Sequence, residues 1–466
     1  MCSKFFNTLP RTYSGPEVRK RIIIIGAGLA GLSAAYELST AGHDVIVLEA
    51  RGRTGGRVLT LRQPFADGLY AEAGGTRISK SHRCATKYIE AFGLPTDPIP
   101  LSADHISYIK GKRIGESDKL DDHLSINLFE SEKRLSVLAL WKQYILPALE
   151  RIRQTTDLNW NSGSIAAFDQ LTFREFLTKQ GASHGAIHLL TLGFSTLNED
   201  VSALMVLRDI AMESDAWQWY TIQGGNDLLP RALASTLPNK IHYGMQVTRI
   251  EQSSTSVAIT ALDGLNEIAI MADFVICSVP LSVLRNIEVI PELSSSKQKA
   301  IRELEYASVA RIYLQSRNRI WVEEGFSRLE LASADLPISR IWDATYAQQG
   351  SRGILLGYTF GKEAQRITAM PETERLSFAL EHMGKVFPHL HENYERGVTK
   401  CWDDDKWAKG AFVCFKPGQM SSLPEQLASV EGRIHFAGEH TSKWSGWMEG
   451  ALESGMRVAR EISEAP

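Results

Sequence analysis

Residues 21–48 read RIIIIGAGLAGLSAAYELSTAGHDVIVL, the clearest structural pattern in the chain. Ile22–Ile25 is a run of β-branched residues, typical of a strand buried on both faces of a parallel sheet. Leu29–Ala41 is rich in alanine and leucine and is followed by Gly42, which favours a helix with a glycine at its C-terminal end. Asp44–Leu48 has the composition of a second short strand. The stretch therefore predicts a β-α-β unit.

A glycine-rich turn joins the first strand to the helix. Gly26, Gly28 and Gly31 form the pattern G-x-G-x-x-G. The first glycine permits a tight turn, the second lets the backbone approach a pyrophosphate, and the third lets helix and strand pack closely. Glu49 ends the second strand, where a carboxylate accepts hydrogen bonds from ribose hydroxyls and disfavours a 2′-phosphate. The unit predicts a dinucleotide site and leaves FAD and NAD open.

A second glycine-rich loop follows directly, because residues 49–57 read EARGRTGGR. Arg51 and Arg57 offer donors to a longer diphosphate cofactor, and a nicotinamide enzyme does not need such a loop. The segment resembles the E-A-x-x-x-x-G-G-R motif of the flavin-dependent amine oxidase superfamily. Residues 436–439 (FAGE) and 446–455 (GWMEGALESG) resemble the second FAD segment of that family. The resemblance thus has motifs at both ends of the chain.

This resemblance extends over about residues 20–463 and implies FAD as the cofactor. It implies non-covalent binding, because Ala411 stands where monoamine oxidases have the cysteine that holds the flavin. The residues that it assigns to FAD are Gly26, Gly28, Gly31, Glu49, Ala50, Arg51, Gly56, Arg57, Gly75, Thr76, Val247, Trp402, Gly438, Glu439, Trp447 and Met448.

Two residues resemble the substrate anchors of L-amino-acid oxidases. Arg77, in the segment GGTRI, resembles the arginine that binds the α-carboxylate of the substrate in those enzymes. A guanidinium group offers planar bidentate donors to a carboxylate. The alternative is that Arg77 pairs with a protein carboxylate or a cofactor phosphate. Tyr358, in the segment GILLGYTFG, resembles the tyrosine that shares the carboxylate with that arginine.

Further residues resemble those that face the flavin ring. Phe412 and Trp447, with Gly446 before it, resemble the residues that flank the substrate amine, where rigid aromatic faces orient the substrate and exclude water. The family usually has a lysine that holds a water near flavin N5, and Arg311, ahead of Trp321, stands at that position. Arginine stays charged and cannot accept a proton. We expect Arg311 to act as a catalytic residue by ordering that water.

The resemblance implies oxidative deamination of an L-amino acid. A hydride passes from the α-carbon to flavin N5, water hydrolyses the imino acid to a 2-oxo acid and ammonia, and oxygen reoxidises the flavin to give hydrogen peroxide. An amino-acid 2-monooxygenase, which decarboxylates its substrate to an amide, would share nearly every motif. An amine or polyamine oxidase is a further alternative, disfavoured by Arg77. The apparently complete substrate anchors argue against a non-catalytic FAD-binding protein.

The chain as a whole is predicted to be α/β, with a Rossmann-like FAD-binding domain, a mixed-sheet substrate domain and a helical insertion. The predicted divisions are 20–73, 223–290 and 430–463 for FAD, 74–117 and 291–429 for substrate, 118–222 for the helices, and 1–19 as a flexible lead-in. We expect helices at 135–152, 173–179, 228–237, 371–387 and 450–462, strands at 274–279, 311–315, 354–358 and 434–436, and an antiparallel meander over 241–272.

Composition limits the remaining classes. The 466 residues are 44% hydrophobic and 23% charged, which excludes a disordered chain or a small disulfide scaffold. The formal net charge of −3 argues against a nucleic-acid or anionic-membrane binder. Five cysteines without a C-x-x-C pair indicate neither a disulfide framework nor a zinc site. No signal peptide or bilayer-spanning run is apparent. We expect a cytoplasmic protein whose partners are an amino acid, oxygen and a second copy in a homodimer.

Overall fold

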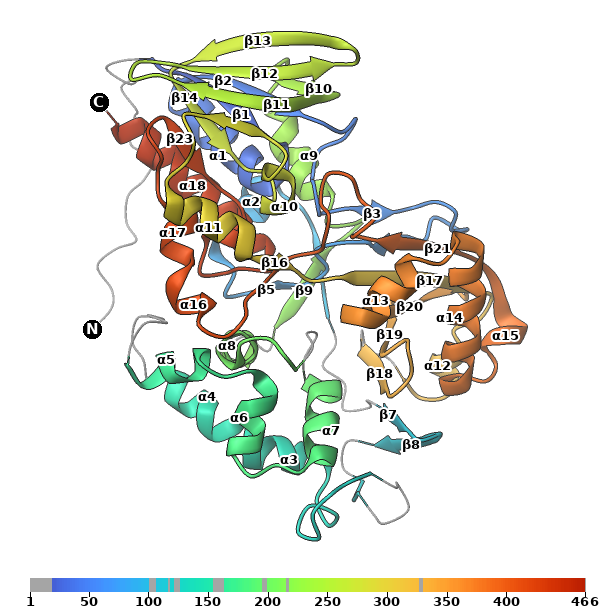
Figure 1. Ribbon diagram of the computed structural model, residues 1–466. Helices are drawn as coiled ribbons and strands as arrows, with labels where there is room; N and C mark the ends of the chain where they lie inside the picture. Colours follow the sequence, from blue (N-terminus) through green and yellow to red (C-terminus); the bar gives the residue numbers. More distant parts are fainter. Residues whose placement is uncertain are drawn as a thin grey trace.

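The computed structural model describes residues 19–99, 106–115, 118–120, 126–153, 163–194, 199–214, 218–326 and 330–465. These residues form the predicted mixed α/β fold (Figure 1). A layered region holds the blue start and the red end of the described chain. A second sheet, drawn mainly in orange, lies beside it, and a group of teal and green helices lies below both.

A five-stranded parallel sheet forms the centre of the layered region, in the order β10-β2-β1-β14-β23. Its strands are β1 Arg21–Ile25, β2 Asp44–Glu49, β10 Ile241–Tyr243, β14 Phe274–Cys277 and β23 Ile434–Phe436. The four isoleucines of β1 are at most 3% exposed, as expected for a strand covered on both faces. The sheet therefore joins the beginning, the middle and the end of the chain.

Two long helices cover this sheet side by side. They are α1 Leu29–Thr40 and α18 Met448–Glu464, of which α18 starts two residues before its predicted beginning. Their contact is so close that a Cβ atom on Gly455 would lie 2.3 Å from the carbonyl oxygen of Ala30. The same region holds α2 Arg83–Ala91 and the predicted helix α9 Leu228–Ser235.

The predicted meander is confirmed for three strands and wrong for its first residues. β11 Met245–Gln252, β12 Val257–Asp263 and β13 Asn266–Ala272 are antiparallel, and β15 Glu288–Ile290 adds to β11 in parallel. β10, which we expected in this meander, instead pairs with β2 in the parallel sheet. Gly244, with a φ of +75°, separates β10 from β11 and lets the chain turn between the two sheets.

A seven-stranded mixed sheet has the order β21-β17-β20-β19-β18-β7-β8. Its strands are β7 Ile106–Ile109, β8 Lys112–Gly115, β17 Val309–Ser316, β18 Glu330–Ala334, β19 Arg340–Asp343, β20 Gly353–Phe360 and β21 Tyr394–Cys401. Its helices are α12 Ile320–Glu323, α13 Gly361–Thr368, the predicted α14 Glu372–Val386, and α15 Leu390–Asn393. The register sets Tyr358 of β20 between Arg311 of β17 and Arg340 of β19.

The helical insertion contains α3 Val137–Tyr144, α4 Leu146–Arg153, α5 Gly163–Asp169, α6 Phe173–Lys179, α7 His184–Phe194 and α8 Ala203–Ser214. The helical character predicted over 135–152 is confirmed, but the stretch forms two helices that meet at Ile145, because Pro147 has no N–H to continue the hydrogen bonds of α3. The insertion also ends in a strand: β9 Trp219–Ile222 pairs with β5 Ile78–Ser79 and β6 Thr96–Pro98.

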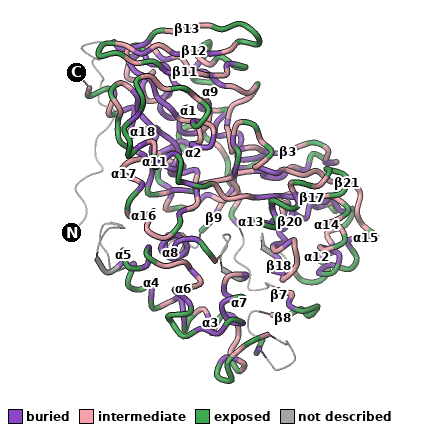
Figure 2. Tube along the Cα trace, in the orientation of Figure 1, coloured by how far each residue is buried: buried purple, intermediate pink, exposed green. Residues whose placement is uncertain are grey.

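Short elements connect these regions, whose buried hydrophobic residues form four clusters in the part of the chain that the structure describes (Figure 2). The short elements are β3 Thr60–Leu61, β4 Ala71–Glu72, α10 Leu281–Leu284, α11 Ser295–Glu303, β16 Glu305–Tyr306, β22 Val413–Cys414, α16 Gln419–Ser422, α17 Pro424–Ala428 and the 3-10 helix η2 Glu439–Thr441. Within the described ranges, no helix has the length and apolar character that crossing a membrane requires. The proposed division into domains stays a prediction.

Candidate active site

A cavity of about 800 Å³ runs from the glycine turn before α1 to the helical insertion. Of the residues predicted to bind FAD or substrate, all but Gly31 line it, and so does Arg311. Gly31 has a different place, because a Cβ atom there would lie 2.0 Å from the carbonyl oxygen of Gly26. It serves the close packing of helix on strand rather than direct contact with a ligand.

The turn around Gly28 is open toward the cavity. A Cβ atom at Gly28 would meet no other atom within 4 Å, and the first residues of α1, Leu29 and Ala30, also line the space. The second glycine loop packs against the turn: the N–H of Gly55 donates to the carbonyl of Ala27 at 2.8 Å. Backbone N–H groups and the positive end of the α1 dipole thus face an open space, which fits the diphosphate of FAD.

Glu49 braces the same turn from the end of β2. Its Oε2 accepts from the N–H of Ala27 at 2.7 Å and its Oε1 accepts from the N–H of Arg51 at 2.8 Å. Burial raises the pKa of the Glu49 carboxyl group, and these two N–H donors act in the opposite direction. Glu49 therefore already fixes the loop. Its further hydrogen bonds to a ribose stay a prediction.

The two arginines predicted to face the diphosphate also have carboxylate partners in the protein. Arg51 makes a bidentate pair with Asp405 at 2.6 and 3.0 Å, and Lys400 reaches the same carboxylate at 2.6 Å. Arg57 donates to Glu439 at 2.9 Å. Arg51 and Arg57 line the cavity, but these contacts share their charge with the protein, so a role as diphosphate donors stays a prediction.

At the other end of the cavity, three indole rings surround Arg77. Its guanidinium carbon lies 5.3 Å from the ring centre of Trp219, 5.8 Å from that of Trp342 and 5.9 Å from that of Trp447. Trp219 and Trp447 are themselves stacked, with ring centres 5.4 Å apart. Aromatic faces hold a guanidinium group in place by cation–π attraction.

Trp219, Trp342 and Arg340 were not predicted to belong to the site. Trp219 lies in the short strand β9, inside the stretch expected to be helical, and Trp342 and Arg340 lie in β19. Arg340 donates to Ser333 at 2.8 Å. No local motif marks these residues. Only the sheet register, which sets Arg340 opposite Tyr358, could have indicated one of them.

Tyr358 lies deep in the cavity wall and stacks on Trp342, with ring centres 5.2 Å apart and planes 7° from parallel. Burial raises the pKa of its phenol, and the positive charges of Arg311, Arg77 and Arg340 partly offset that effect. The hydroxyl group is therefore protonated at neutral pH and can donate a hydrogen bond. Arg77 and Tyr358 thus lie in electrostatic range of each other in one wall of the cavity.

Arg311 is held by a carbonyl and a hydroxyl group of the segment before Arg77. Its Nη1 donates to the carbonyl of Glu72 at 2.9 Å and to Oγ1 of Thr76 at 3.0 Å, and its guanidinium carbon lies 5.1 Å from the ring centre of Tyr358. Its buried Nε has no hydrogen-bond partner among the described residues. A buried donor of this kind fits an ordered water, as expected for Arg311.

The helical insertion closes the cavity with a mostly apolar surface. The charged residues that the insertion contributes to this wall are Asp209 of α8 and Arg153 of α4. Burial raises the pKa of the Asp209 carboxyl group, while Arg208, Trp447 and Arg77 act against that effect. The apolar and aromatic lining residues from the insertion are Val137, Leu138, Trp141, Leu146, Met205, Val206, Ile210 and Trp219.

Comparisons with known proteins agree with this geometry. The family model described as flavin containing amine oxidoreductase matches residues 29–463. "Putative L-amino-acid oxidase YobN" of Bacillus subtilis (strain 168) is 33% identical, over 96% of this chain and 95% of its own. The L-amino-acid oxidase of Gloydius blomhoffii is 30% identical, over 96% of this chain and 89% of its own.

Solved structures share the fold. Putrescine oxidase bound to putrescine superposes with a TM-score of 0.80 at 21% identity, over 96% of this chain and 99% of that one. Cyclohexylamine oxidase from Brevibacterium oxydans IH-35A gives a TM-score of 0.81 at 24% identity, with the same coverage. The cofactor is FAD, for which the two glycine loops and the N-terminus of α1 provide a fitting site. The chain belongs to the flavin-containing amine oxidoreductases.

Proposed function

We propose that this protein is an FAD-dependent L-amino-acid oxidase. It would convert an L-amino acid, oxygen and water to a 2-oxo acid, ammonia and hydrogen peroxide. The observation that carries this proposal is that Arg77 and Tyr358 line the same cavity and both pack against the ring of Trp342. A planar guanidinium group beside a phenolic donor is suited to bind a carboxylate, the group that distinguishes an amino acid from an amine.

The chain supplies orientation and a water-poor pocket for this reaction. Arg77 and Tyr358 would hold the α-carboxylate, and the rings of Phe412 and Trp447 would flank the amino group. FAD, when bound, would supply the acceptor for the hydride that leaves the Cα–H bond of the substrate, while the Cα–N bond becomes the double bond of the imino acid. Arg311 would order a water or anion for the oxygen step. Ala411 supports non-covalent binding, because alanine has no side-chain nucleophile.

An amine oxidase is the second candidate, and Asp209 is the observation that favours it. A carboxylate in the cavity wall would attract a cationic amine, as the relation to putrescine oxidase would suggest. Arg208 donates to that carboxylate at 2.6 and 3.1 Å, which reduces its attraction for a second cation. The guanidinium groups near Tyr358 also disfavour a dication, and we therefore rank the amino acid first.

Flavin bleaching under nitrogen tests the proposal. The purified holoenzyme is mixed with a panel of L-amino acids and with the amines that result from their decarboxylation, and the flavin absorbance is followed. We expect at least one amino acid to bleach the flavin and its matched amine to leave it oxidised. Bleaching by amines alone would support an amine oxidase, and a flavin that stays yellow with all compounds would indicate a binding protein.

The products separate the oxidase from the monooxygenase. In air, the proposal predicts equal amounts of hydrogen peroxide and 2-oxo acid for each amino acid consumed. A monooxygenase would give an amide and carbon dioxide instead. A coupled peroxide assay and mass spectrometry of the products distinguish these outcomes directly.

We also propose a cytoplasmic location. The four cysteines in the described part of the chain, Cys84, Cys277, Cys401 and Cys414, are free thiols, which fits a reducing compartment. The expected homodimer is a proposal as well, and its test is the molar mass of the holoenzyme in solution by light scattering.

A further inference from the structure

Two adjacent charged residues of α8 connect the helical insertion to the loop before α18. Arg208 directs Nε and Nη2 to the same oxygen, Oδ1 of Asp209, at 3.1 and 2.6 Å. The side chain of Arg208 is only 2% exposed, whereas 26% of the Asp209 side chain stays accessible, because Asp209 lines the cavity. The pair therefore has one member inside the protein and one at the site.

Arg208 holds the loop directly. Its Nη1 donates to Oγ of Ser445 at 2.6 Å, and its Nη2 donates to the carbonyl of Ser445 at 3.2 Å. Ser445 immediately precedes Gly446 and Trp447, which line the cavity. One guanidinium group thus links α8 to the residue next to the aromatic wall of the site.

Asp209 reaches the same wall from the cavity side. The Trp447 side chain and the positive charge of Arg77 both lie near enough to Asp209 to act against the burial that raises the pKa of its carboxyl group. Trp447 in turn packs beside Arg77: the guanidinium carbon of Arg77 lies 5.9 Å from the ring centre of Trp447. A shift of α8 would therefore reach Arg77 through Trp447.

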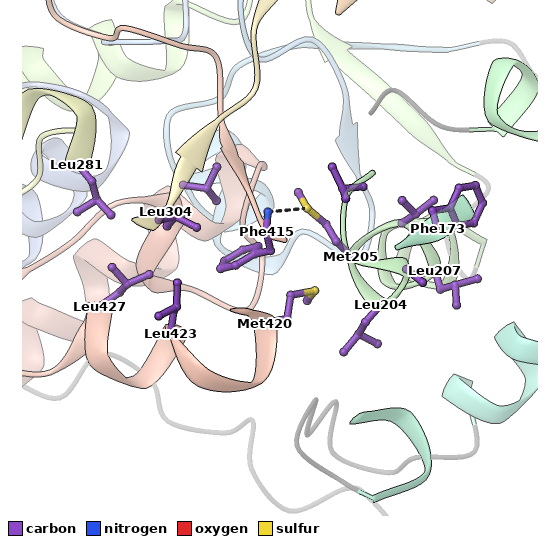
Figure 3. Packing of buried hydrophobic residues seen from close by; sticks show 14 of the residues in the cluster. Phe173, Leu204, Met205, Leu207, Leu281, Leu304, Phe415, Met420, Leu423 and Leu427 are labelled. Carbon is purple, nitrogen blue, oxygen red and sulfur yellow. Dashed lines mark hydrogen bonds between the residues drawn. The ribbon is translucent and has the colours of Figure 1, made fainter. Parts of the chain in front are cut away.

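α8 itself is also held at its first turn, where Met205 and the preceding Ser202 contact Phe415 (Figure 3). The N–H of Phe415 donates to Sδ of Met205 at 3.4 Å, and the carbonyl of Phe415 accepts from Ser202 at 2.8 Å. Figure 3 shows Met205 and Met420 on the side of Phe415 that faces α8, in a cluster that continues on the other side through Leu423 and Leu427. This packing makes α8 a rigid support on which the ion pair can fix a loop.

We propose that Arg208 and Asp209 are positioning residues that fix Gly446 and Trp447, and through Trp447 the guanidinium group of Arg77. Neither is required to carry a proton or to touch the flavin. The effect on the loop is independent of the substrate, whereas the effect on carboxylate binding rests on the proposed function. For stability alone, apolar side chains serve a buried contact as well as an ion pair does. The feature to test is therefore the fixed geometry in which the guanidinium group of Arg208 contacts both Asp209 and Ser445.

The experiment compares Arg208→Met, Arg208→Lys and Ser445→Ala with the control Arg174→Met. Arg174 forms an ion pair with Glu199 in the same insertion and does not line the cavity. Hydrogen exchange of the holoenzyme is followed by mass spectrometry in peptides that cover 443–448. There the N–H of Gly446 donates to Oε2 of Glu439 at 2.7 Å, and the N–H of Trp447 donates to the carbonyl of Trp444 at 3.2 Å.

We expect exchange in 443–448 to become about tenfold faster in Arg208→Met, because the loop loses its fixed contact to α8. The KM for the best amino acid should rise about 10- to 100-fold, with a smaller fall in kcat, since a displaced Trp447 misplaces Arg77. Arg208→Lys should bring both the exchange rate and the KM part of the way back to the wild-type values, because lysine keeps the positive charge but lacks the planar guanidinium group. Ser445→Ala should show a smaller change, and Arg174→Met none.

Unchanged exchange in 443–448 together with an unchanged KM in Arg208→Met would overturn the proposal. Equal effects in Arg174→Met would also overturn it, because they would indicate general loosening of the insertion. If Arg208→Met does not fold, Ser445→Ala and Arg208→Lys carry the same test. If no amino acid reduces the flavin, the proposed function fails, and hydrogen exchange still decides whether the pair fixes the loop.

Discussion

Main chain forms much of the cavity surface next to α1, whereas side chains form most of the surface next to α8. At the first end, Gly28 and Gly56 bring backbone close to the ligand space. At the second end, Arg77 and Tyr358 come from separate segments and depend on Trp219, Trp342 and Trp447 for their places. The α1 end requires glycine, because a side chain there would fill the ligand space. The α8 end requires particular side chains, because they form the contacts to the substrate.

Because of this difference, the α8 end should select its ligand more narrowly than the α1 end does. Backbone N–H groups and a helix dipole recognise a diphosphate, which many cofactors share. A guanidinium group, a phenol and stacked indoles instead distinguish one substrate class from another. We therefore expect changes at the α1 end to affect cofactor content, and changes at the α8 end to affect which substrate is oxidised.

The largest expected effect is at the substrate end. Arg77→Met removes the charged partner of the carboxylate, which typically costs about 2–5 kcal/mol and lowers kcat/KM about 30- to 4,000-fold. The loss should appear for the amino acid and be small for its matched amine, measured by steady-state oxygen consumption. Arg77→Lys, the control, should recover only part, because lysine lacks the planar fork. An equal loss with amine and amino acid would contradict the assignment of Arg77.

At the α1 end of the cavity, two glycines of the same turn allow the effect on fold stability to be separated from the effect on FAD binding. Gly31→Ala forces a Cβ atom to 2.0 Å from the Gly26 carbonyl, so we expect it to lower the free energy of unfolding of the flavin-free protein by about 1–3 kcal/mol or more. Gly28→Ala faces open space and has an ordinary φ of −75°. It should leave that free energy unchanged and weaken FAD binding at least about tenfold, because the methyl group occupies ligand space.

Chemical unfolding of the apoprotein and fluorescence titration with FAD measure these two effects separately. Gly52→Ala, at a position where a Cβ atom would meet nothing within 4 Å, is the control for both. Weakened FAD binding in Gly31→Ala without lost stability would contradict the packing role of Gly31.

Arg311 also lines the cavity, and its replacement should affect flavin reoxidation by oxygen more than flavin reduction by the substrate. Arg311→Met removes the buried donor expected to order a water, and we expect flavin reoxidation by oxygen to slow about tenfold or more. Reduction by the amino acid should change less, because Arg77 and Tyr358 remain. Stopped-flow absorbance measures both steps. An unchanged oxidative half-reaction would disprove the role, and Arg311→Lys serves as the variant that keeps a charge and a donor.

A smaller effect is expected for the pH dependence of stability at Glu72. Burial raises the pKa of its carboxyl group to about 8, so the folded state holds a proton that the unfolded state releases above its own pKa near 4.5. Stability should therefore fall as pH rises between these values, by up to about 1.4 kcal/mol per pH unit. Glu72→Gln, which is neutral at every pH, should show a shallower fall between pH 6 and 8 in denaturant titrations. Parallel curves for both proteins would contradict this.

Local sequence patterns predicted four of the five parallel strands, α1, α6 and the glycine turn, because each depends on neighbours within a few residues. Patterns failed where the partner was distant. β10 resembled the meander that follows it but pairs with β2. β9 lay in a stretch with helical character, and its pairing with β5 and β6 brings Trp219 to the site. Tertiary pairing overrode local preference in both cases.

Family resemblance supplied Arg77, Tyr358 and Arg311, but the surroundings of these residues needed the structure. Arg340 reaches Tyr358 only through the register of β19 and β20. Asp405, the last of three consecutive acidic residues, is paired with Arg51 and Lys400. The contact between Arg51 and Asp405 joins residues 354 positions apart, and no spacing in the sequence records it.

The amino-acid sequence alone fixes the cofactor turn, because glycine is required wherever backbone must approach a phosphate or another helix, and these requirements act over a few residues. Only the tertiary structure brings Arg77, Trp219, Tyr358 and Trp447 around one space. The physical reason is that side-chain contacts depend on how sheets and helices pack, and packing joins segments that share no local pattern. The same reason gives Arg208 its place: its neighbours in the sequence do not reveal that it holds Ser445.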